Sequence, residues 1–219
     1  MRFEFRTTQD GSLTVFDAVA GECFKSRHAA QLEVQAVFLT PGLRENPYFG
    51  LVQPFRILEL GFGLGTNFLA LAEERLPLHF TSIERDLSGA KFFLEDQAQP
   101  SLSEIVATKK FRAGDFHAEL LEGDFFSLLP EMAARGEKFH AIFFDPFSPK
   151  ANPEAWTDHL FRLAAALLYP SGRLVTYSVC RSAKDSAVSA GLEITKHKLP
   201  NTLKKRSALV AVKPADALQ

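Results

Sequence analysis

From residue 55 onward, short apolar runs alternate with stretches of helical periodicity. This pattern is typical of a parallel sheet covered by helices on both faces. The strands are predicted near residues 55–60, 79–84, 117–122, 139–145 and 172–178. The helices between them are predicted near residues 66–75, 87–97, 126–135, 153–168 and 182–190. The sequence therefore predicts an α/β fold with a mostly parallel, doubly wound sheet.

The first 50 residues precede this alternation and have patterns of their own. Apolar residues alternate on both sides of a turn signal at Gln9-Asp10-Gly11-Ser12, which predicts a β-hairpin over residues 2–17. Helical spacing follows from Ala29 to Leu39, and Pro41-Gly42 is expected to stop that helix. We expect a single domain over residues 1–219, in which residues 1–50 cover a core formed by residues 51–219.

The C-terminal part changes character again. Residues 192–198 and 206–212 are both strand-like and are joined through Pro200-Asn201, which predicts an antiparallel hairpin at the sheet edge. The segment 98–113 is harder to interpret, and Ser101 to Lys110 fits a short helix over one edge. No internal repeat, low-complexity segment or linker is present.

Composition excludes several classes of protein. The net charge of −1 argues against a protein that coats nucleic acid through bulk charge, although a local basic patch stays compatible with it. Cys23 and Cys180 match no metal or redox spacing, and the histidines form no metal-binding pattern, so no metal site is predicted. No apolar run approaches the roughly 18 residues that span a bilayer, and no signal peptide is evident. We therefore expect a cytoplasmic protein without a membrane partner.

The most informative local pattern follows the first core strand. The apolar run that contains Glu59 leads into Gly61, Gly63 and Gly65, after which Asn67 opens a helix. Glycines let a ligand press against bare main chain, and the helix N-terminus adds free N–H groups and partial positive charge. A nucleotide-like ligand is the expected occupant. The alternative is an ordinary tight turn between strand and helix with no ligand.

The charges around this loop favour S-adenosylmethionine (SAM). The dinucleotide fingerprint requires G-x-G-x-x-G, whereas the spacing here is G-x-G-x-G, and no G-K-[ST] follows as in a P-loop. Glu59 would repel a pyrophosphate but attract an ammonium group. SAM has no phosphate and carries both an α-amino group and a sulfonium, so it suits this carboxylate better than NAD does.

Acidic residues stand at the ends of four predicted strands, where open α/β sheets bind ligands. We expect Glu84 to bind the ribose hydroxyls, and Asp124 to accept from the adenine amine while Phe125 packs on the base. The alternative for each acid is an N-cap of the next helix. These acids, in chain order, are Glu59, Glu84, Asp124 and Asp145.

The last of these acids begins the loop Asp145-Pro-Phe-Ser-Pro-Lys150. Two prolines stiffen the loop, and Phe147 places an aromatic ring in a turn, where polar residues are the norm. We interpret the loop as a substrate pocket in which Phe147 stacks on a planar group and Asp145 accepts from an amine. The alternative is a rigid turn with Phe147 folded into the core.

Two stretches carry a family resemblance. Asp145-Pro-Phe-Ser-Pro-Lys-Ala-Asn-Pro-Glu-Ala-Trp156, preceded by Gly61-Phe-Gly-Leu-Gly-Thr-Asn-Phe68, resembles the methyltransferase domain of the MnmC family of bifunctional tRNA-modifying proteins. The family pattern is D-x-F-[AS]-P-x-x-N-P-x-x-W, and the resemblance runs from about residue 26 to about residue 210. The family's glycine loop reads E-x-G-F-G-T-G-L-N-F. Here Leu64 and Thr66 exchange places, which keeps the glycine spacing and the following asparagine.

The resemblance implies a Rossmann-like class I SAM-dependent methyltransferase. It further implies methylation of the aminomethyl group on wobble uridine 34, with the anticodon loop of tRNA as substrate. No FAD-dependent oxidoreductase half follows, so we expect a separate enzyme to supply the aminomethyl intermediate. Asp145 is expected to orient the amine and to stabilise the positive charge that grows on its nitrogen.

An anticodon base must be splayed out and stacked on aromatic rings to be modified, for which Phe147 and Trp156 are candidates. Basic residues near the C-terminus, with one near the loop, are expected to bind phosphates, although a solvated edge hairpin explains them equally well. These residues are Lys196, Lys198, Lys204, Lys205, Arg206 and, near the loop, Lys150.

Two other functions stay open at this point. An aminopropyltransferase of the spermidine-synthase type uses decarboxylated SAM and also pairs an aspartate-containing loop with an amine. Glu59 near the amino-acid end of the ligand favours intact SAM over that alternative. The second is a catalytically silent module that binds SAM or RNA.

Overall fold

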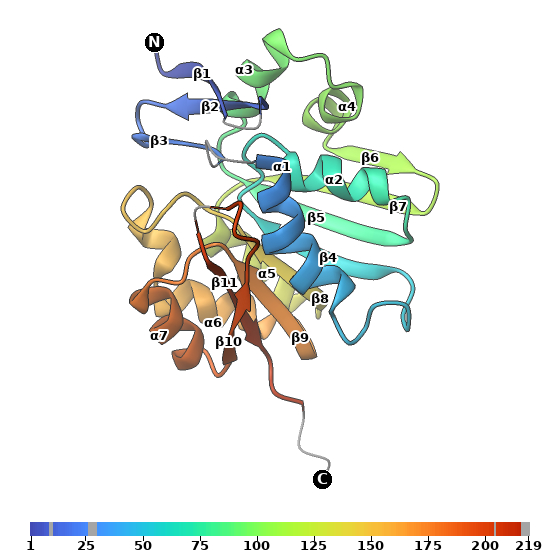
Figure 1. Cartoon of the computed structure of the whole chain (residues 1–219). Coiled ribbons are helices and arrows are strands. Elements are labelled where there is room, and N and C mark those ends of the chain that lie inside the picture. Colours follow the sequence, from blue (N-terminus) through green and yellow to red (C-terminus); the bar gives the residue numbers. More distant parts are fainter. Residues whose placement is uncertain (9–10, 26–29, 204, 216–219) are drawn as a thin grey trace.

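The computed structural model describes residues 1–8, 11–25, 30–203 and 205–215, and Figure 1 shows their arrangement. Within this part, eight strands form the central sheet in the order β10-β11-β9-β8-β4-β5-β7-β6. The five strands from β9 to β7 run parallel, and the edge strands pair antiparallel, which confirms the predicted sheet and its edge hairpin. The strands are β4 (Phe55–Leu60), β5 (Leu78–Glu84), β6 (Lys110–Ala113), β7 (Phe116–Glu122), β8 (Phe139–Phe144), β9 (Leu168–Thr176), β10 (Glu193–Lys198) and β11 (Ser207–Val212).

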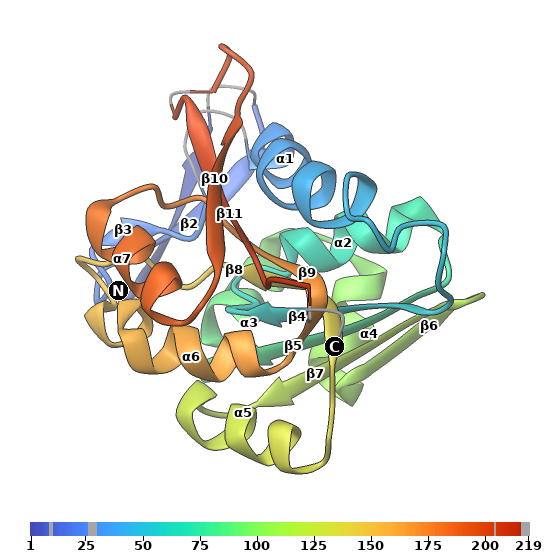
Figure 2. The ribbon, with the colours of Figure 1, turned by 90° about the horizontal axis from the view of Figure 1, so that it is seen from below.

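Helices cover both faces of the sheet because the central strands are apolar on both sides. On β8, Phe143 joins the apolar cluster under one set of helices, and Phe144 joins the cluster under the other. Figure 2 shows α5 and α6 on one side and α1 and α2 on the other. The first set is α1 (Ala30–Glu33), the π-helix η1 (Val34–Arg44), α2 (Thr66–Glu74), α3 (Ser88–Asp96) and α4 (Pro100–Thr108). The second set is α5 (Phe125–Ala134), the 3₁₀-helix η2 (Pro153–Trp156), α6 (Asp158–Ala166) and α7 (Arg181–Ser189).

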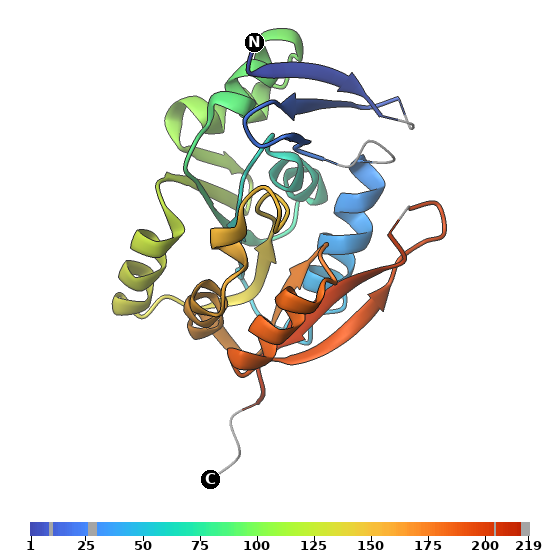
Figure 3. The same cartoon turned by 90° about the vertical axis from the view of Figure 1, so that its left-hand side faces the viewer.

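The N-terminal residues form a small sheet of their own beside α3 (Figure 3). The predicted hairpin is confirmed as β1 (Phe3–Thr7) and β2 (Leu13–Asp17), and a third strand, β3 (Glu22–Cys23), follows. The Phe5 ring stacks on Phe92 of α3 at a centroid distance of 4.8 Å. We call residues 1–25 of this region, as far as they are described, the N-terminal cover.

The prediction that Pro41-Gly42 stops the first helix was wrong. The helix continues as η1 to Arg44, with Pro41 inside it. Pro41 has no backbone N–H to donate within the helix, and its own carbonyl accepts from Nη1 of Arg173 at 2.8 Å. A Cβ atom on Gly42 would lie 2.7 Å from the Phe143 ring, so the glycine lets η1 press closely onto the sheet rather than ending it.

Two local boundaries also differ from the predictions. The helix predicted over residues 153–168 is divided, because Thr157 acts as an N-cap for α6 and separates it from η2. Strand β6 was not predicted, since its four residues, two of them basic, have no strand-like periodicity before they pair with β7. The short helix expected over one edge is present as α4.

Candidate active site

The loop after β4 requires glycine, both for its backbone conformation and for its close contacts with neighbouring residues. Gly61, Gly63 and Gly65 have φ values of +97°, +54° and +72°. A Cβ atom on Gly61 would lie only 2.7 Å from the carbonyl oxygen of Asp145. The loop can therefore contact the residue that follows β8 only because Gly61 has no side chain.

A cavity of about 590 Å³ opens beside this loop, at the carboxyl ends of the parallel strands. A smaller cavity of about 170 Å³ adjoins it. Five residues line both cavities and so form the boundary between them: Phe24, Glu84, Phe125, Phe147 and Asn152. A ligand with a polar tail and a planar ring has room for the tail in one cavity and for the ring in the other.

Two of the predicted acids stand at this boundary or beside it. Glu84 accepts from the backbone N–H of Gly63 and of Asp86, each at 3.1 Å, and burial raises its pKa. Asp124 lines the smaller cavity, and its Oδ1 accepts from the N–H of Phe126 at 2.8 Å. Asp124 is therefore an N-cap of α5 and a cavity residue at the same time.

Asp145 lines the larger cavity and belongs to a chain of buried polar groups. Nδ2 of Asn67 donates to Oδ2 of Asp145 at 3.2 Å and to Oε1 of Glu59 at 2.8 Å. Ser82 donates to Glu59 from the other side at 2.5 Å. Burial, with help from the charge of Asp145, raises the pKa of Glu59 to about 8, so this carboxyl group is mostly protonated at neutral pH.

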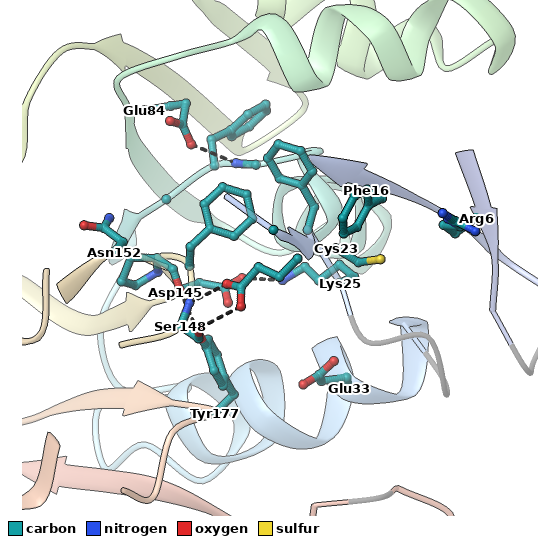
Figure 4. Close-up of a pocket in the computed structure, with 18 of the residues that line it drawn as sticks. Arg6, Phe16, Cys23, Lys25, Glu33, Glu84, Asp145, Ser148, Asn152 and Tyr177 are labelled. Carbon is teal, nitrogen blue, oxygen red and sulfur yellow. Dashed lines mark hydrogen bonds and ion pairs between the residues drawn. The ribbon is translucent and has the colours of Figure 1, made fainter. Parts of the chain in front are cut away.

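The strongest partner of Asp145 is Lys25 of the N-terminal cover, whose Nζ forms an ion pair with Oδ2 of Asp145. Figure 4 shows the two side chains facing each other within the larger cavity. Lys25 is only 8% exposed. Burial alone would lower its pKa, but the charges of Asp145 and Glu33 outweigh burial and raise it, so Lys25 stays protonated.

The two predicted aromatic residues have different surroundings. Phe147 lines both cavities and packs against Phe24 with ring centroids 4.8 Å apart. Trp156 is 5% exposed and does not line either cavity. Its Nε1 donates to the carbonyl of Phe147 at 2.8 Å, and its ring packs on Phe144. Trp156 thus supports the loop from behind.

The structure brings together only part of the predicted site. Gly61, Gly63, Glu84, Phe125, Asp145, Phe147 and Lys205 line the larger cavity. Glu59, Gly65 and Asn67 are buried just behind its wall, because the β4 face that carries Glu59 is covered by α2. Lys150 and Arg206 are exposed and line neither cavity. Lys204 lies outside the described residues.

Sequence reasoning missed the contribution of the N-terminal cover to the site. Glu22 accepts from the N–H of Ser148 at 2.6 Å and from its hydroxyl at 2.7 Å. Phe24 packs against Phe147, and Lys25 forms an ion pair with Asp145. Nothing in the sequence indicated that Glu22, Phe24 and Lys25 meet this loop.

The polar residues around the cavities fit SAM. Behind the wall, the Oδ1 atom of Asn67 is buried and lacks a hydrogen-bond partner among the described residues. A carboxylate at the boundary, Glu84, suits a ribose diol, and the aromatic Phe125 beside Asp124 suits an adenine. In the described part, no three His, Cys, Asp or Glu side chains are placed to hold a metal ion. Every described helix is too short or too polar to traverse a bilayer.

The fold and the site define an enzyme of the class that transfers methyl groups from SAM. A family model described as S-adenosyl-L-methionine-dependent methyltransferase matches residues 91–214, and the chain belongs to this family. This finding confirms the class I fold and the SAM cofactor that the sequence predicted.

Among individual proteins, the chain is similar to members of the MnmC family, as the resemblance in sequence implied. The chain is 30% identical over 213 residues to the tRNA 5-methylaminomethyl-2-thiouridine biosynthesis bifunctional protein MnmC of Chromobacterium violaceum, an alignment that covers 86% of this chain and 31% of the relative. This chain spans about a third of the length of the curated relatives that it matches.

Solved structures give the same picture. The crystal structure of MnmC2 from Aquifex aeolicus matches with a TM-score of 0.79 and 26% identity, covering 99% of this chain and 73% of that one. Spermidine synthase from Thermotoga maritima matches with a TM-score of 0.64 but only 13% identity, covering 98% of this chain and 70% of that one, which indicates a shared fold alone.

Proposed function

We propose that this enzyme transfers the methyl group of SAM to a primary amine, and that the acceptor is the 5-aminomethyl group of wobble uridine 34 in tRNA. One observation carries the proposal: Asp145, at the carboxyl end of β8, already binds a primary ammonium, that of Lys25. The names of the relatives point to the same amine, since they describe biosynthesis of 5-methylaminomethyl-2-thiouridine in tRNA.

In this proposal the glycine loop and the strand ends hold the cofactor. Glu84 binds the ribose hydroxyls, while Asp124 and Phe125 hold the adenine in the smaller cavity. Gly61 and Gly63 offer bare backbone to the methionine part. Three residues behind the wall complete the cofactor site by holding these groups in place: Glu59, Gly65 and Asn67.

SAM, when bound, supplies a methyl group on a positively charged sulfur. The protein's main task is to hold the acceptor nitrogen in line with that methyl, and such positioning contributes several of the ~7–11 kcal/mol that proximity can provide. Asp145 accepts an N–H of the amine, which aims the nitrogen lone pair and stabilises its growing positive charge. The proton that leaves the product ammonium goes to water.

The acceptor base would lie against the loop that begins at Asp145. Phe147 provides the ring on which a splayed base stacks, and Trp156 keeps the loop rigid from behind. Lys205 lines the cavity with its Nζ 3.9 Å from the Tyr177 ring centroid, and exposed Arg206 and Lys150 extend the positive surface toward the phosphates.

We further propose three features of the wider setting. Residues 1–50 act as a cover over the cofactor site of a single domain that spans residues 1–219. A separate enzyme supplies the aminomethyl form of the tRNA. Both reactions take place in the cytoplasm.

The test is to incubate the protein with SAM labelled in its methyl group and with bulk tRNA that lacks the wobble methyl, and then to digest the tRNA to nucleosides. The proposal predicts that the label appears in 5-methylaminomethyl-2-thiouridine and in no other nucleoside. Label in a different nucleoside, or in none, contradicts it. A tRNA pool that already carries the methyl is the matched control.

The aminopropyltransferase alternative shares the fold of spermidine synthase, and the fold alone does not separate the two functions. Thermal unfolding in the presence of SAM and of decarboxylated SAM separates the two functions. The methyltransferase is stabilised more by SAM. A catalytically silent binding module would be stabilised by SAM yet would label no tRNA.

A further inference from the structure

The segment Glu22–Lys25 of the N-terminal cover contacts the loop 145–148 at three points. The first point is Glu22, whose two carboxylate oxygens accept from the N–H and the hydroxyl of Ser148. Charge-assisted hydrogen bonds of this kind are among the stronger ones, so this end of the segment is anchored. The residues that follow are thereby directed at Phe147 and Asp145.

The second point is the ring of Phe24, which lies in a slot between the loop and two glycines. Its centroid is 4.8 Å from that of Phe147. A Cβ atom on Gly63 would lie 3.2 Å from the Phe24 ring, and one on Gly89 would lie 2.4 Å from it. The slot therefore admits a flat ring, with bare backbone on one side and the Phe147 ring, tilted by 50°, on the other.

The third point is the ammonium of Lys25, which lies beside Asp145 and is enclosed. Its Nζ is 5.2 Å from the centroid of the Phe38 ring, and Glu33 lines the same cavity and adds a second negative charge. An ammonium beside a carboxylate and an aromatic face has the partners that a primary amine of a ligand would need.

We propose that Phe24 and Lys25 are an internal stand-in for the acceptor: the ring of Phe24 occupies the place of the acceptor's base, and the Lys25 ammonium occupies the place of its amine. The acceptor then binds by displacing both side chains from Phe147 and Asp145. This inference rests on the proposed function, because it takes Asp145 and Phe147 as the acceptor's partners.

Such a stand-in lowers the apparent affinity for the acceptor, since only the fraction of molecules in which the site is open can bind it. Removing the Lys25 ammonium increases that fraction. Lys25→Met is expected to bind an amine-bearing ring about 5–10-fold more tightly than the wild type does, provided that the open fraction rises from about a tenth to most of the molecules.

The first test measures binding without turnover. The nucleoside 5-aminomethyluridine is titrated by calorimetry into the full chain saturated with S-adenosylhomocysteine, for the wild type, Lys25→Met and Lys138→Met. Lys138 is a control because it precedes β8, at the end of that strand opposite to Asp145, where it donates to the carbonyl of Ala166. Tighter binding by Lys25→Met alone supports the inference. Equal or weaker binding overturns it, since Lys25 would then be a structural or acceptor-binding residue.

The second test uses the wild-type protein, so it does not depend on the folding of a variant. Lys25 is buried and should resist acylation by acetic anhydride, as read by mass spectrometry of peptides. Saturating 5-aminomethyluridine, kept in molar excess over the anhydride because its own amine consumes the reagent, should expose Lys25 and raise its acylation at least about fivefold. Uridine with an equal concentration of ethanolamine, which consumes the reagent in the same way, should not. Lys25 that stays protected in an enzyme that does methylate tRNA overturns this inference alone. An enzyme that methylates no tRNA contradicts the proposed function, and the acylation result still decides whether the stand-in is displaced.

Discussion

Asn67 donates from its Nδ2 atom to Oδ2 of Asp145 at 3.2 Å, so the helix that follows the glycine loop fixes the carboxylate at the end of a different strand. The same atom donates to Oε1 of Glu59 at 2.8 Å. One amide group thus joins the ends of β4 and β8 under the larger cavity. The cofactor site and the acceptor site are held together by this side chain.

This relationship makes the amide of Asn67 hard to replace by a carboxylate of the same shape. Asn67→Asp turns the shared donor into an acceptor that faces two carboxyl groups. We expect it to lower the free energy of unfolding by about 1–3 kcal/mol more than Asn67→Ala does. Urea unfolding of both variants at pH 7 measures the difference. Equal stability of the two variants would show that the donor has no partner in solution.

The raised pKa of Glu59 predicts that the free energy of unfolding depends on pH. In the folded protein its pKa is about 8, while the unfolded chain releases this proton near the ordinary value of 4.5. The folded state therefore binds more protons between these values, and the free energy of unfolding falls as pH rises from 4.5 through about 8.

Glu59→Gln removes this contribution. Its amide oxygen can still accept from Asn67, while its NH2 group faces the Ser82 hydroxyl, which then has to accept instead of donate. Between pH 5 and pH 9 the variant should lose less stability than the wild type, by several kcal/mol in the limit of full ionisation. Urea unfolding at several pH values tests this. Parallel curves for the two proteins would mean that Glu59 is ionised throughout.

Gly61 and Gly114 form a matched pair for testing the glycine loop. Both have positive φ, at +97° and +59°, but a Cβ atom on Gly61 would meet the Asp145 carbonyl, whereas one on Gly114 would meet no atom within 4 Å. Gly114→Ala should cost only the backbone strain of about 1–2 kcal/mol. Gly61→Ala should cost more and should also reduce turnover. Similar losses in both variants would argue against a close contact between the two loops.

The basic surface near the C-terminus predicts the salt dependence of tRNA binding. Lys205→Met combined with Arg206→Met should reduce the slope of log K against log salt by about 0.7 for each phosphate contact that is lost. The control pair is Lys110→Met with Arg112→Met on β6, at the opposite edge of the sheet. Filter binding over a range of salt concentrations measures both slopes. An unchanged slope in the first pair would support a solvated hairpin that does not contact tRNA.

The core of the fold was predictable because its signals are local. The apolar run of β4, the glycines after it and the helical spacing of α2 lie within 20 residues, and each indicates one element. Because these strands are parallel, the acids that end them lie at the same side of the sheet. Strand β6 was missed because its four residues gain strand character only from pairing with β7.

The N-terminal cover's share of the site was not predictable from the sequence. Lys25 and Asp145 are 120 residues apart, and no periodicity in either segment indicates that they meet. The sequence also did not indicate that Glu59 and Trp156 are buried behind the cavity wall. An acid at a strand end and a tryptophan in a motif look the same in sequence whether they line a cavity or lie behind its wall. Burial by α2 in the first case and by Phe144 in the second decides their position.

The central claim is that Asp145 acts on the acceptor amine and not on the cofactor. It is tested most directly by Asp145→Asn, with SAM affinity measured by calorimetry and turnover by transfer of labelled methyl to tRNA. We predict nearly unchanged SAM affinity and a turnover lower by about 10²-fold or more. Turnover equal to that of the wild type, or a loss of SAM binding that accounts for the lost activity, would contradict the claim.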